Sequence, residues 1–200
     1  MRLVLNPNRM SSPKGQCFQL RFNLSFWGLF LAVLFTVLPG RGAVSTLQPP
    51  REYRLRFYHT HTNERLEVVY RRGDAYLPAE LARLDYFLRD HRTGDVHHFD
   101  PRLFDLLHDL TESLKDAGGE IDVICGYRTR WSNEFLRTRS AHTGVALHSL
   151  HMQAEAIDIR LPGVPTSDLR DAALRLRRGG VGYYSASNFV HVDVGRVRRW

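Results

Sequence analysis

The chain contains little cysteine and shows no internal repeat. Its two cysteines among 200 residues are Cys17 and Cys125. Cys17 falls in an N-terminal segment that differs from the rest, so Cys125 is alone in the remainder and cannot form a disulfide within it. Repeats of solenoid period and long low-complexity runs are also missing, which excludes solenoid and fibrous classes. With 43% hydrophobic and 24% charged residues, the composition is that of one globular domain.

Acidic residues are missing from residues 1–43, which contain five basic ones. Within this segment, residues 24–38 (LSFWGLFLAVLFTVL) carry no charge. This run is short for a membrane span of about 20 residues but is typical of the apolar core of a signal peptide. Pro39 and Gly40 end it, before small residues where cleavage would occur. We expect residues 1–43 to be a signal peptide or a membrane anchor, 44–50 a linker, and 51–200 a domain outside the cytoplasmic membrane.

The excess of positive charge lies mostly in that N-terminal segment. The whole chain has 28 Lys and Arg, 21 Asp and Glu, and a net charge of +7. Without the five basic residues of 1–43, the balance is 23 to 21, or +2. This is too small for the basic surface of a nucleic-acid-binding protein, so no nucleic-acid partner is expected. The basic clusters at 175–178 and 196–199 are interpreted as a solvated face or as a surface that meets an anionic polymer.

Hydrophobic periodicity predicts an α+β domain. The strands are expected at 53–59, 65–70, 121–125, 154–161, 181–184 and 189–194. The helices are expected at 77–89, from Asp100 to Gly118-Gly119, at 131–139, and from about 169 to Gly179-Gly180. Because helices do not alternate strictly with strands, we expect a mostly antiparallel sheet with flanking helices rather than a doubly wound fold.

Most of the ten histidines are not expected to bind a metal. His59 and His61 share a strand face and could do so, but no third ligand is close in the sequence. His142 precedes the segments discussed next and could neighbour a site. The remaining four outside those segments are interpreted as polar-loop or boundary residues: His91, His97, His98 and His108.

Two segments combine histidine with acidic residues at spacings that suit a metal site. In HSLHMQAEAIDI (148–159), strand alternation places Asp158 on one face and Glu155 on the other. Asp158 lies between two isoleucines, so its carboxylate needs a cation or a metal as partner. In NFVHVD (188–193), His191 and Asp193 share a face. Two histidines, one aspartate and a water form the open arrangement of a catalytic zinc, but a hydrogen-bonded polar cluster fits the same residues.

A family resemblance separates these alternatives. The segments ICGYRTRWSNEFLR (124–137), SLHMQAEAIDIRL (149–161) and RRGGVGYYSASNFVHVDVGRVRRW (177–200) resemble the murein endopeptidase K family of M15-type peptidoglycan peptidases. The resemblance covers about residues 50–200. It implies the Hedgehog/D-Ala-D-Ala-peptidase fold, which is an α+β architecture. It also implies one Zn²⁺ per chain, held by His151, Asp158 and His191.

The resemblance further implies hydrolysis of peptide cross-links in peptidoglycan, in the periplasm, during cell-wall growth or remodelling. Arg128 would stabilise the developing oxyanion or hold a substrate carboxylate. Asp193 would be either the general base or the residue that orients a histidine ligand. Four further residues are expected near the substrate or behind the ligands: Tyr127, Ser149, His148 and Asn188.

Two positions depart from the family pattern. Ala154 stands where relatives commonly have glycine, which is tolerated if its φ is negative. Asn188 stands where many zinc D,D-peptidases have an acidic base. An amide cannot accept the proton, and this feature leaves open a non-catalytic zinc-containing domain that binds the cell wall. A D-Ala-D-Ala carboxypeptidase also stays open, because the sequence does not show whether the cleft is closed at one end around a free carboxylate. The sequence also leaves open which cross-link is cut.

Overall fold

The computed structural model describes residues 48–114, 119–139 and 144–200. The expected leader with its apolar run, as well as Gly118 and His142, lies outside these described residues. Within them, no helix combines the length and the apolar character needed to cross a membrane.

The described residues form an eight-stranded sheet with four α-helices. The first half comprises β1 (Glu52–His59), β2 (Arg65–Arg72), β3 (Ala75–Tyr76), α1 (Pro78–Phe87), α2 (Pro101–Ser113), β4 (Glu120–Cys125) and α3 (Arg130–Thr138). The second half comprises the 3₁₀ helix η1 (Leu150–Gln153), β5 (Ala156–Arg160), α4 (Thr166–Leu176), β6 (Gly180–Tyr184), the 3₁₀ helix η2 (Ser185–Ser187), β7 (Phe189–Asp193) and β8 (Arg198–Arg199).

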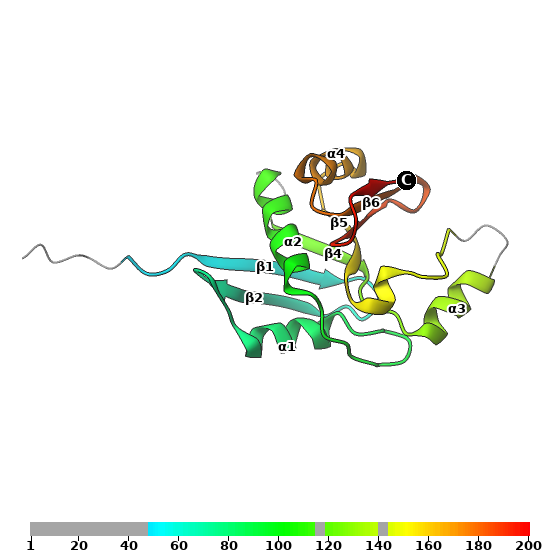
Figure 1. The fold of residues 1–200 in the computed structure, drawn as a ribbon, viewed down its shortest axis with the longest axis horizontal. Coiled ribbons are helices and arrows are strands. Elements are labelled where there is room, and N and C mark those ends of the chain that lie inside the picture. The colour runs from blue at the N-terminus through cyan, green and yellow to red at the C-terminus, as the bar shows by residue number, and fades with distance from the viewer. Residues whose placement is uncertain (1–47, 115–118, 140–143) are drawn as a thin grey trace, which may run out of the picture. The chain divides into compact units, whose positions relative to one another are not determined.

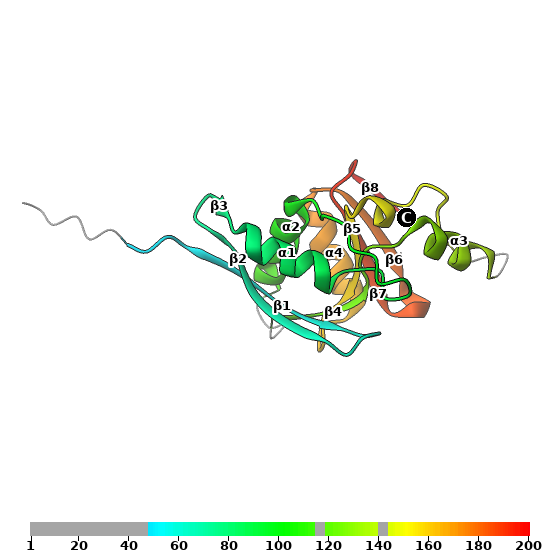
Figure 2. The same cartoon turned by 90° about the horizontal axis from the view of Figure 1, so that it is seen from below.

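The sheet is mixed but mostly antiparallel, with strand order β3-β2-β1-β4-β5-β7-β6-β8. Only the β1–β4 and β6–β8 pairs are parallel among the described strands. A parallel pair requires a crossover, and α1 and α2 lie in the one that joins β1 and β4. α2 packs against β1 and α4, while α4 packs against β6 and β7. In both views α3 stands apart from the other three helices (Figures 1 and 2). The predicted α+β class is confirmed.

Helix α2 shows how the sequence builds the core. Asp100 caps it by accepting a hydrogen bond from the backbone N–H of Arg102, and Pro101 occupies its first turn. Leucines spaced by three and four residues then form one fully or almost fully buried stripe: Leu103, Leu106, Leu107 and Leu110. Each contributes about 1.5–3 kcal/mol by burial. The helix ends at Ser113, earlier than the glycine pair that was expected to end it.

The segment before β5 differs from the sequence prediction. The strand was expected from 154 but begins at Ala156, and Ala154 closes η1 with a φ of +53°. The condition under which alanine was expected to be tolerated at position 154, a negative φ, is therefore not met. The reversal is needed because the chain leaves η1, which carries His151, and turns directly into β5. An L-residue in this left-handed conformation is destabilised by about 1–2 kcal/mol relative to glycine.

The end of α4 also differs from the prediction. The helix stops at Leu176 with Arg177 in the left-handed conformation, not at Gly179-Gly180. The two glycines instead allow the chain to pass close to Asp193. A Cβ on Gly179 would lie 1.7 Å from the Asp193 carbonyl oxygen, and one on Gly180 would lie 2.4 Å from Asp193 Oδ2. Neither position can hold a side chain without displacing this aspartate.

Candidate metal centre

Three buried side chains from two strands and a 3₁₀ helix meet at one point. Asp158 and His191 are directly paired across the antiparallel β5–β7 ladder, and η1 brings His151 to them. The Oδ1 atom of Asp158 lies 2.8 Å from His191 Nδ1 and 3.1 Å from His151 Nε2. The two ring nitrogens are 3.1 Å apart. Strand pairing and the η1 turn thus bring together the three residues expected as metal ligands.

The second nitrogen of each ring shows which atoms carry protons. His151 Nδ1 lies 2.7 Å from the carbonyl oxygen of Gly126, which can only accept a hydrogen bond. His191 Nε2 lies 3.3 Å from Asp193 Oδ2, which is also an acceptor. Protons on these two nitrogens leave lone pairs on His151 Nε2 and His191 Nδ1. Both lone pairs then face the carboxylate of Asp158, so three acceptors point at a common centre.

Such a centre requires positive charge. Burial opposes ionisation of Asp158, yet His151 and His191 hold the pKa of its carboxyl well below the usual range, so it is an anion. Burial lowers the pKa of His151. At His191 burial is outweighed by hydrogen bonds to Asp158 and Asp193, which raise its pKa. A proton on His191 would place positive charge at one of the three atoms, whereas a metal ion can be bound by all three. Two imidazole nitrogens and a carboxylate oxygen fit the ligand set of catalytic zinc.

Cys125, which the sequence analysis considered only as a residue unable to form a disulfide within the domain, lies beside this centre. Its Sγ is within 4.8 Å of ligand atoms of His151 and Asp158, and it is paired with Asp158 across β4–β5. Burial raises the pKa of the thiol to about 12, which keeps it protonated and disfavours it as a ligand. His191 Nδ1 lies 2.8 Å from Asp158 Oδ1 and 3.1 Å from His151 Nε2, and an imidazole nitrogen binds zinc more readily than a protonated thiol, so we favour the His-Asp-His set over the Cys-His-Asp set.

Asp193 is completely buried behind His191. Its Oδ1 accepts hydrogen bonds from the backbone N–H groups of Gly180 at 2.8 Å and Gly195 at 2.9 Å. Its Oδ2 contacts His191 Nε2 and lies 2.8 Å from Arg198 Nη2. The carboxylate is thus occupied by four groups and lies on the side of the His191 ring opposite Asp158. This arrangement suits a residue that fixes the ring better than one that accepts a proton from water.

Arg128 and Ser149 are joined to the third ligand. The backbone N–H of Arg128 donates to the carbonyl oxygen of His151 at 3.1 Å, and its Nη2 donates to Ser149 Oγ at 3.4 Å. Ser149 Oγ also accepts from the backbone N–H of His151 and so caps η1. Arg128 lines the cleft above the centre, and its buried Nε has no hydrogen-bond partner among the described residues.

Of the other three expected residues, one lies at the rim of the cleft and two lie outside its lining. His148 is exposed at the rim of the cleft. Tyr127 does not line the cleft, and its ring packs 5.0 Å from that of His97. Asn188 is also outside the cleft lining. It occupies a left-handed position with φ +53° after η2, where its Oδ1 accepts from Thr166 Oγ1 at 3.3 Å. Asparagine tolerates this conformation, so its presence here has a local structural reason.

The cleft above the centre has a volume of about 330 Å³ and is rich in cationic groups. Arg92, Arg128 and Arg198 line it, and Asp158 is the only acid among its described lining residues. His61 and His91 also line it, with ring centroids 4.1 Å apart and nearly parallel planes. The expectation that His91 is a solvated loop residue is therefore wrong. No local signal in the sequence identifies these residues, because three separate loops and β8 bring them together.

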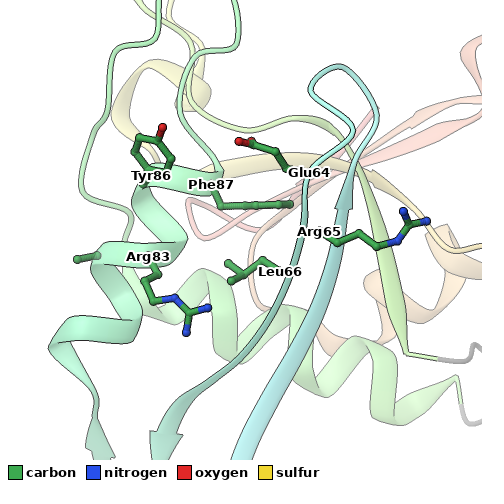
Figure 3. Close-up of a pocket in the computed structure, with 7 residues that line it drawn as sticks. Glu64, Arg65, Leu66, Arg83, Tyr86 and Phe87 are labelled. Carbon is green, nitrogen blue, oxygen red and sulfur yellow. The ribbon is translucent and has the colours of Figure 1, made fainter.

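A second hollow of about 420 Å³ lies between α1 and β2 (Figure 3). Its lining is largely apolar and includes Leu66, Tyr86 and Phe87. The one acid there, Glu64, is paired with Arg89 at 3.0 Å. No group of metal-ligand atoms among the described residues lies in this hollow, so the chemistry belongs to the first cleft.

Comparison with known proteins agrees with this arrangement. The family model described as peptidoglycan L,D-endopeptidase MepK matches residues 46–200. A probable peptidoglycan L,D-endopeptidase MepK of Haemophilus influenzae is 41% identical over 177 residues, covering 88% of this chain and 92% of the relative. The peptidoglycan L,D-endopeptidase MepK of Escherichia coli strain K12 is 41% identical over 158 residues, covering 79% and 85%. No solved structure matches the chain significantly. The chain therefore belongs to the peptidoglycan L,D-endopeptidase MepK family of M15 peptidases.

Proposed function

We propose that this chain is a zinc-dependent endopeptidase that hydrolyses L,D peptide cross-links of peptidoglycan in the periplasm, in cell-wall growth or remodelling. The observation that carries the proposal is the convergence of His151 Nε2, Asp158 Oδ1 and His191 Nδ1 within 3.1 Å of one another. Membership of the MepK family supports the substrate class and the compartment.

The three ligands would hold one Zn²⁺ and leave a fourth position open to the cleft. Zinc there supplies Lewis-acid polarisation of the scissile carbonyl and a water of lowered pKa. The chain's own contribution is the orientation of the ligands. The Gly126 carbonyl fixes the His151 ring, and Asp193 fixes the His191 ring. Both contacts also select the tautomer whose lone pair faces the metal.

Arg128 is positioned to act on the substrate. It lines the cleft and is tied by its backbone N–H to the carbonyl of His151, and its Nε is buried without a partner in the described part of the chain. A guanidinium fixed beside the metal would stabilise negative charge that develops on the scissile carbonyl oxygen.

The proton acceptor must come from the cleft, and Asp193 faces away from it. Among the described cleft residues that are not ligands, His61, His91 and His148 carry imidazole groups. Burial lowers the pKa of His61, and lowers that of His91 to about 4. His148 is exposed at the rim. We therefore assign it as the general base that receives a proton from the attacking water.

One observation favours a second candidate, a non-catalytic zinc-containing domain that binds the cell wall. Among the described residues, the cleft has no carboxylate beyond the ligand Asp158, and an acidic base is therefore missing from it. Such a domain would bind zinc and muropeptides but release no product. A D-Ala-D-Ala carboxypeptidase, the other alternative, would release only single D-Ala residues.

Product masses from defined muropeptides separate these candidates. Zinc-loaded protein is incubated with one dimer joined by an L,D cross-link and one joined by a D,D cross-link, with and without chelator. The proposal expects two monomers from the L,D dimer and loss of cleavage with chelator. Loss of one D-Ala would favour the carboxypeptidase. Stoichiometric zinc without any product would favour the wall-binding domain.

A further inference from the structure

Two guanidinium groups in the cleft have buried N–H groups without partners. These are Nη1 of Arg92 and Nε of Arg128, for which the described residues offer no acceptor. Both arginines line the cleft above the metal ligands. Buried donors are almost always hydrogen-bonded in native proteins, so each of these N–H groups requires an acceptor. Two such donors in one cleft therefore indicate an anionic ligand that supplies the missing acceptors.

A buried aspartate fixes Arg92 next to Arg128. Asp90 is completely buried, and its Oδ2 accepts hydrogen bonds from the backbone N–H of Thr129 at 2.8 Å and from Thr129 Oγ1 at 2.9 Å. Its Oδ1 accepts from the backbone N–H of Arg92 at 3.0 Å. One carboxylate thus joins the turn that carries Arg92 to the residue that follows Arg128. The arrangement is preorganised, which reduces the entropy lost when a ligand binds.

A second contact joins the same two segments. The backbone N–H of Tyr127 donates to the carbonyl oxygen of Leu88 at 2.8 Å. The approach is possible because residue 126 is glycine, since a Cβ there would lie 2.5 Å from the Leu88 carbonyl oxygen. Segments 88–92 and 126–129 are therefore held together by two sets of contacts, and the arginine of each segment lines the cleft.

The wall beside Arg92 does not neutralise it. His61 and His91 stack with centroids 4.1 Å apart. Burial and then Arg92 lower the pKa of both rings, that of His91 to about 4. Both rings are therefore neutral at neutral pH, and neither can balance the charge of Arg92. Asp158 is committed to the metal ligand set, so no other carboxylate among the described lining residues can pair with Arg92.

We propose that Arg92, beside Arg128, forms a subsite that binds a free carboxylate of the peptide substrate. The inference rests on the proposed function, because it names the substrate group that this cleft takes beyond the scissile bond. A guanidinium binds a carboxylate through two parallel hydrogen bonds, so the fork of Arg92 suits this group. Cross-linked stem peptides carry such carboxylates on their glutamate and diaminopimelate residues.

The test compares muropeptides that differ by one charge. L,D cross-linked dimers are prepared with free carboxylates, with an amidated diaminopimelate carboxyl, or with an amidated glutamate carboxyl. The variants are Arg92→Gln, Arg92→Lys and, as control, Arg83→Gln, whose arginine pairs with Glu80 and lines the second hollow rather than the cleft. Kd is measured by tryptophan fluorescence, since Trp200 lines the cleft, and kcat/KM by product formation.

We expect wild type to bind the free dimer about 10- to 100-fold more tightly than one of the two amidated dimers, the factor of a hydrogen bond to a charged group. The dimer that shows the loss identifies the carboxylate. Arg92→Gln should remove this preference and raise KM on the free dimer, with kcat little changed. Arg92→Lys should retain part of it, and Arg83→Gln all of it.

Equal affinities for all three dimers in wild type would overturn the subsite. An equal loss of affinity for all three dimers in Arg92→Gln would also overturn it. These outcomes are separate from the proposed function, which fails if wild type binds zinc and muropeptides but cleaves none of them. The Kd preference still decides the subsite in that case.

Discussion

Nε2 of His191 lies 3.3 Å from Oδ2 of Asp193, on the side of the ring opposite the nitrogen that faces Asp158. The aspartate is held in turn by two backbone N–H groups and by Arg198. The ring of His191 therefore has one tautomer and one orientation set by the protein. Of the two roles that the sequence left open for Asp193, this relationship favours the orientation of the His191 ring.

Asp193→Asn should weaken zinc binding by about 10- to 100-fold, the usual effect of removing a group that orients a metal-bound histidine. The amide presents both a donor and an acceptor and no longer selects the His191 tautomer. Zinc affinity is measured by competition with a chelating dye. The pH dependence of kcat/KM at saturating zinc should keep its shape. Normal zinc affinity with a lost pH limb would instead identify Asp193 as the base.

His151→Ala should abolish stoichiometric zinc binding and reduce cleavage of the L,D dimer to the level seen with chelator. The variant removes one of three ligands, and two ligands hold zinc weakly. Metal content after gel filtration and product masses measure the two effects. His97→Ala is the control, because His97 is exposed and lies outside the cleft lining. Wild-type turnover by His151→Ala would contradict the zinc mechanism.

His148→Gln should lower kcat by about 100-fold, within the usual contribution of a general base, and leave zinc content unchanged. The glutamine is similar in size but cannot take the proton from water. The measurement is the pH profile of kcat, which should lose its ascending limb in the variant. A change of less than about threefold would remove His148 as base.

Ala154→Gly should raise the free energy of unfolding by up to about 1 kcal/mol. Glycine relieves the left-handed φ, by about 1–2 kcal/mol, and this gain exceeds the loss of one buried methyl group, about 0.8 kcal/mol. Ala156→Gly is the matched control, since Ala156 is equally buried but lies in β5. The control should be destabilised. Urea unfolding at equal zinc occupancy measures both, and similar losses in the two variants would refute the explanation.

Stability should fall as the pH drops from about 6.5 to about 4. His59 is completely buried, its Nε2 has no partner among the described residues, and burial lowers its pKa to about 4. The unfolded chain binds a proton at this histidine below about pH 6.5, whereas the folded chain does not. The loss at His59 amounts to up to about 3 kcal/mol, and His91 acts in the same direction.

Urea unfolding at pH 7, 5.5 and 4 measures this dependence. His59→Leu should make the free energy of unfolding less dependent on pH over this interval, because the variant has no proton to bind there. His97→Leu should keep the wild-type slope, since His97 is exposed. An unchanged slope in His59→Leu would show that other groups dominate.

Local patterns predicted much of the fold and identified Asp158 and His191, two of the three residues that converge. Strand alternation separates Asp158 from Glu155 within a few residues, and the His191–Asp193 spacing is equally local. The predictions that failed concern residues whose contact partners are distant in the chain. Gly180 resembles a helix stop in the sequence. Glycine is required there because a Cβ would collide with the carboxylate of Asp193. The family pattern, rather than alternation, selected His151.

The cleft itself could not be predicted, for the same physical reason. His91 follows a helix and precedes a polar loop, as a solvated histidine would. Its contact with His61 exists only because the turn after α1 meets the end of β1. Asn188 was expected near the chemistry from its distance to His191, but the left-handed turn after η2 directs it to Thr166. Sequence spacing fixes strand faces and does not fix the direction of turns.

The contacts of Asp90 with Thr129, and of Leu88 with Tyr127, have a consequence for protein engineering. Segments 88–92 and 126–129 are about 40 residues apart in the chain but form one module in the folded protein. A chimera that imports only one of them from a relative would separate the buried carboxylate from its donors. Loop exchange intended to retarget the enzyme should therefore transplant both segments together.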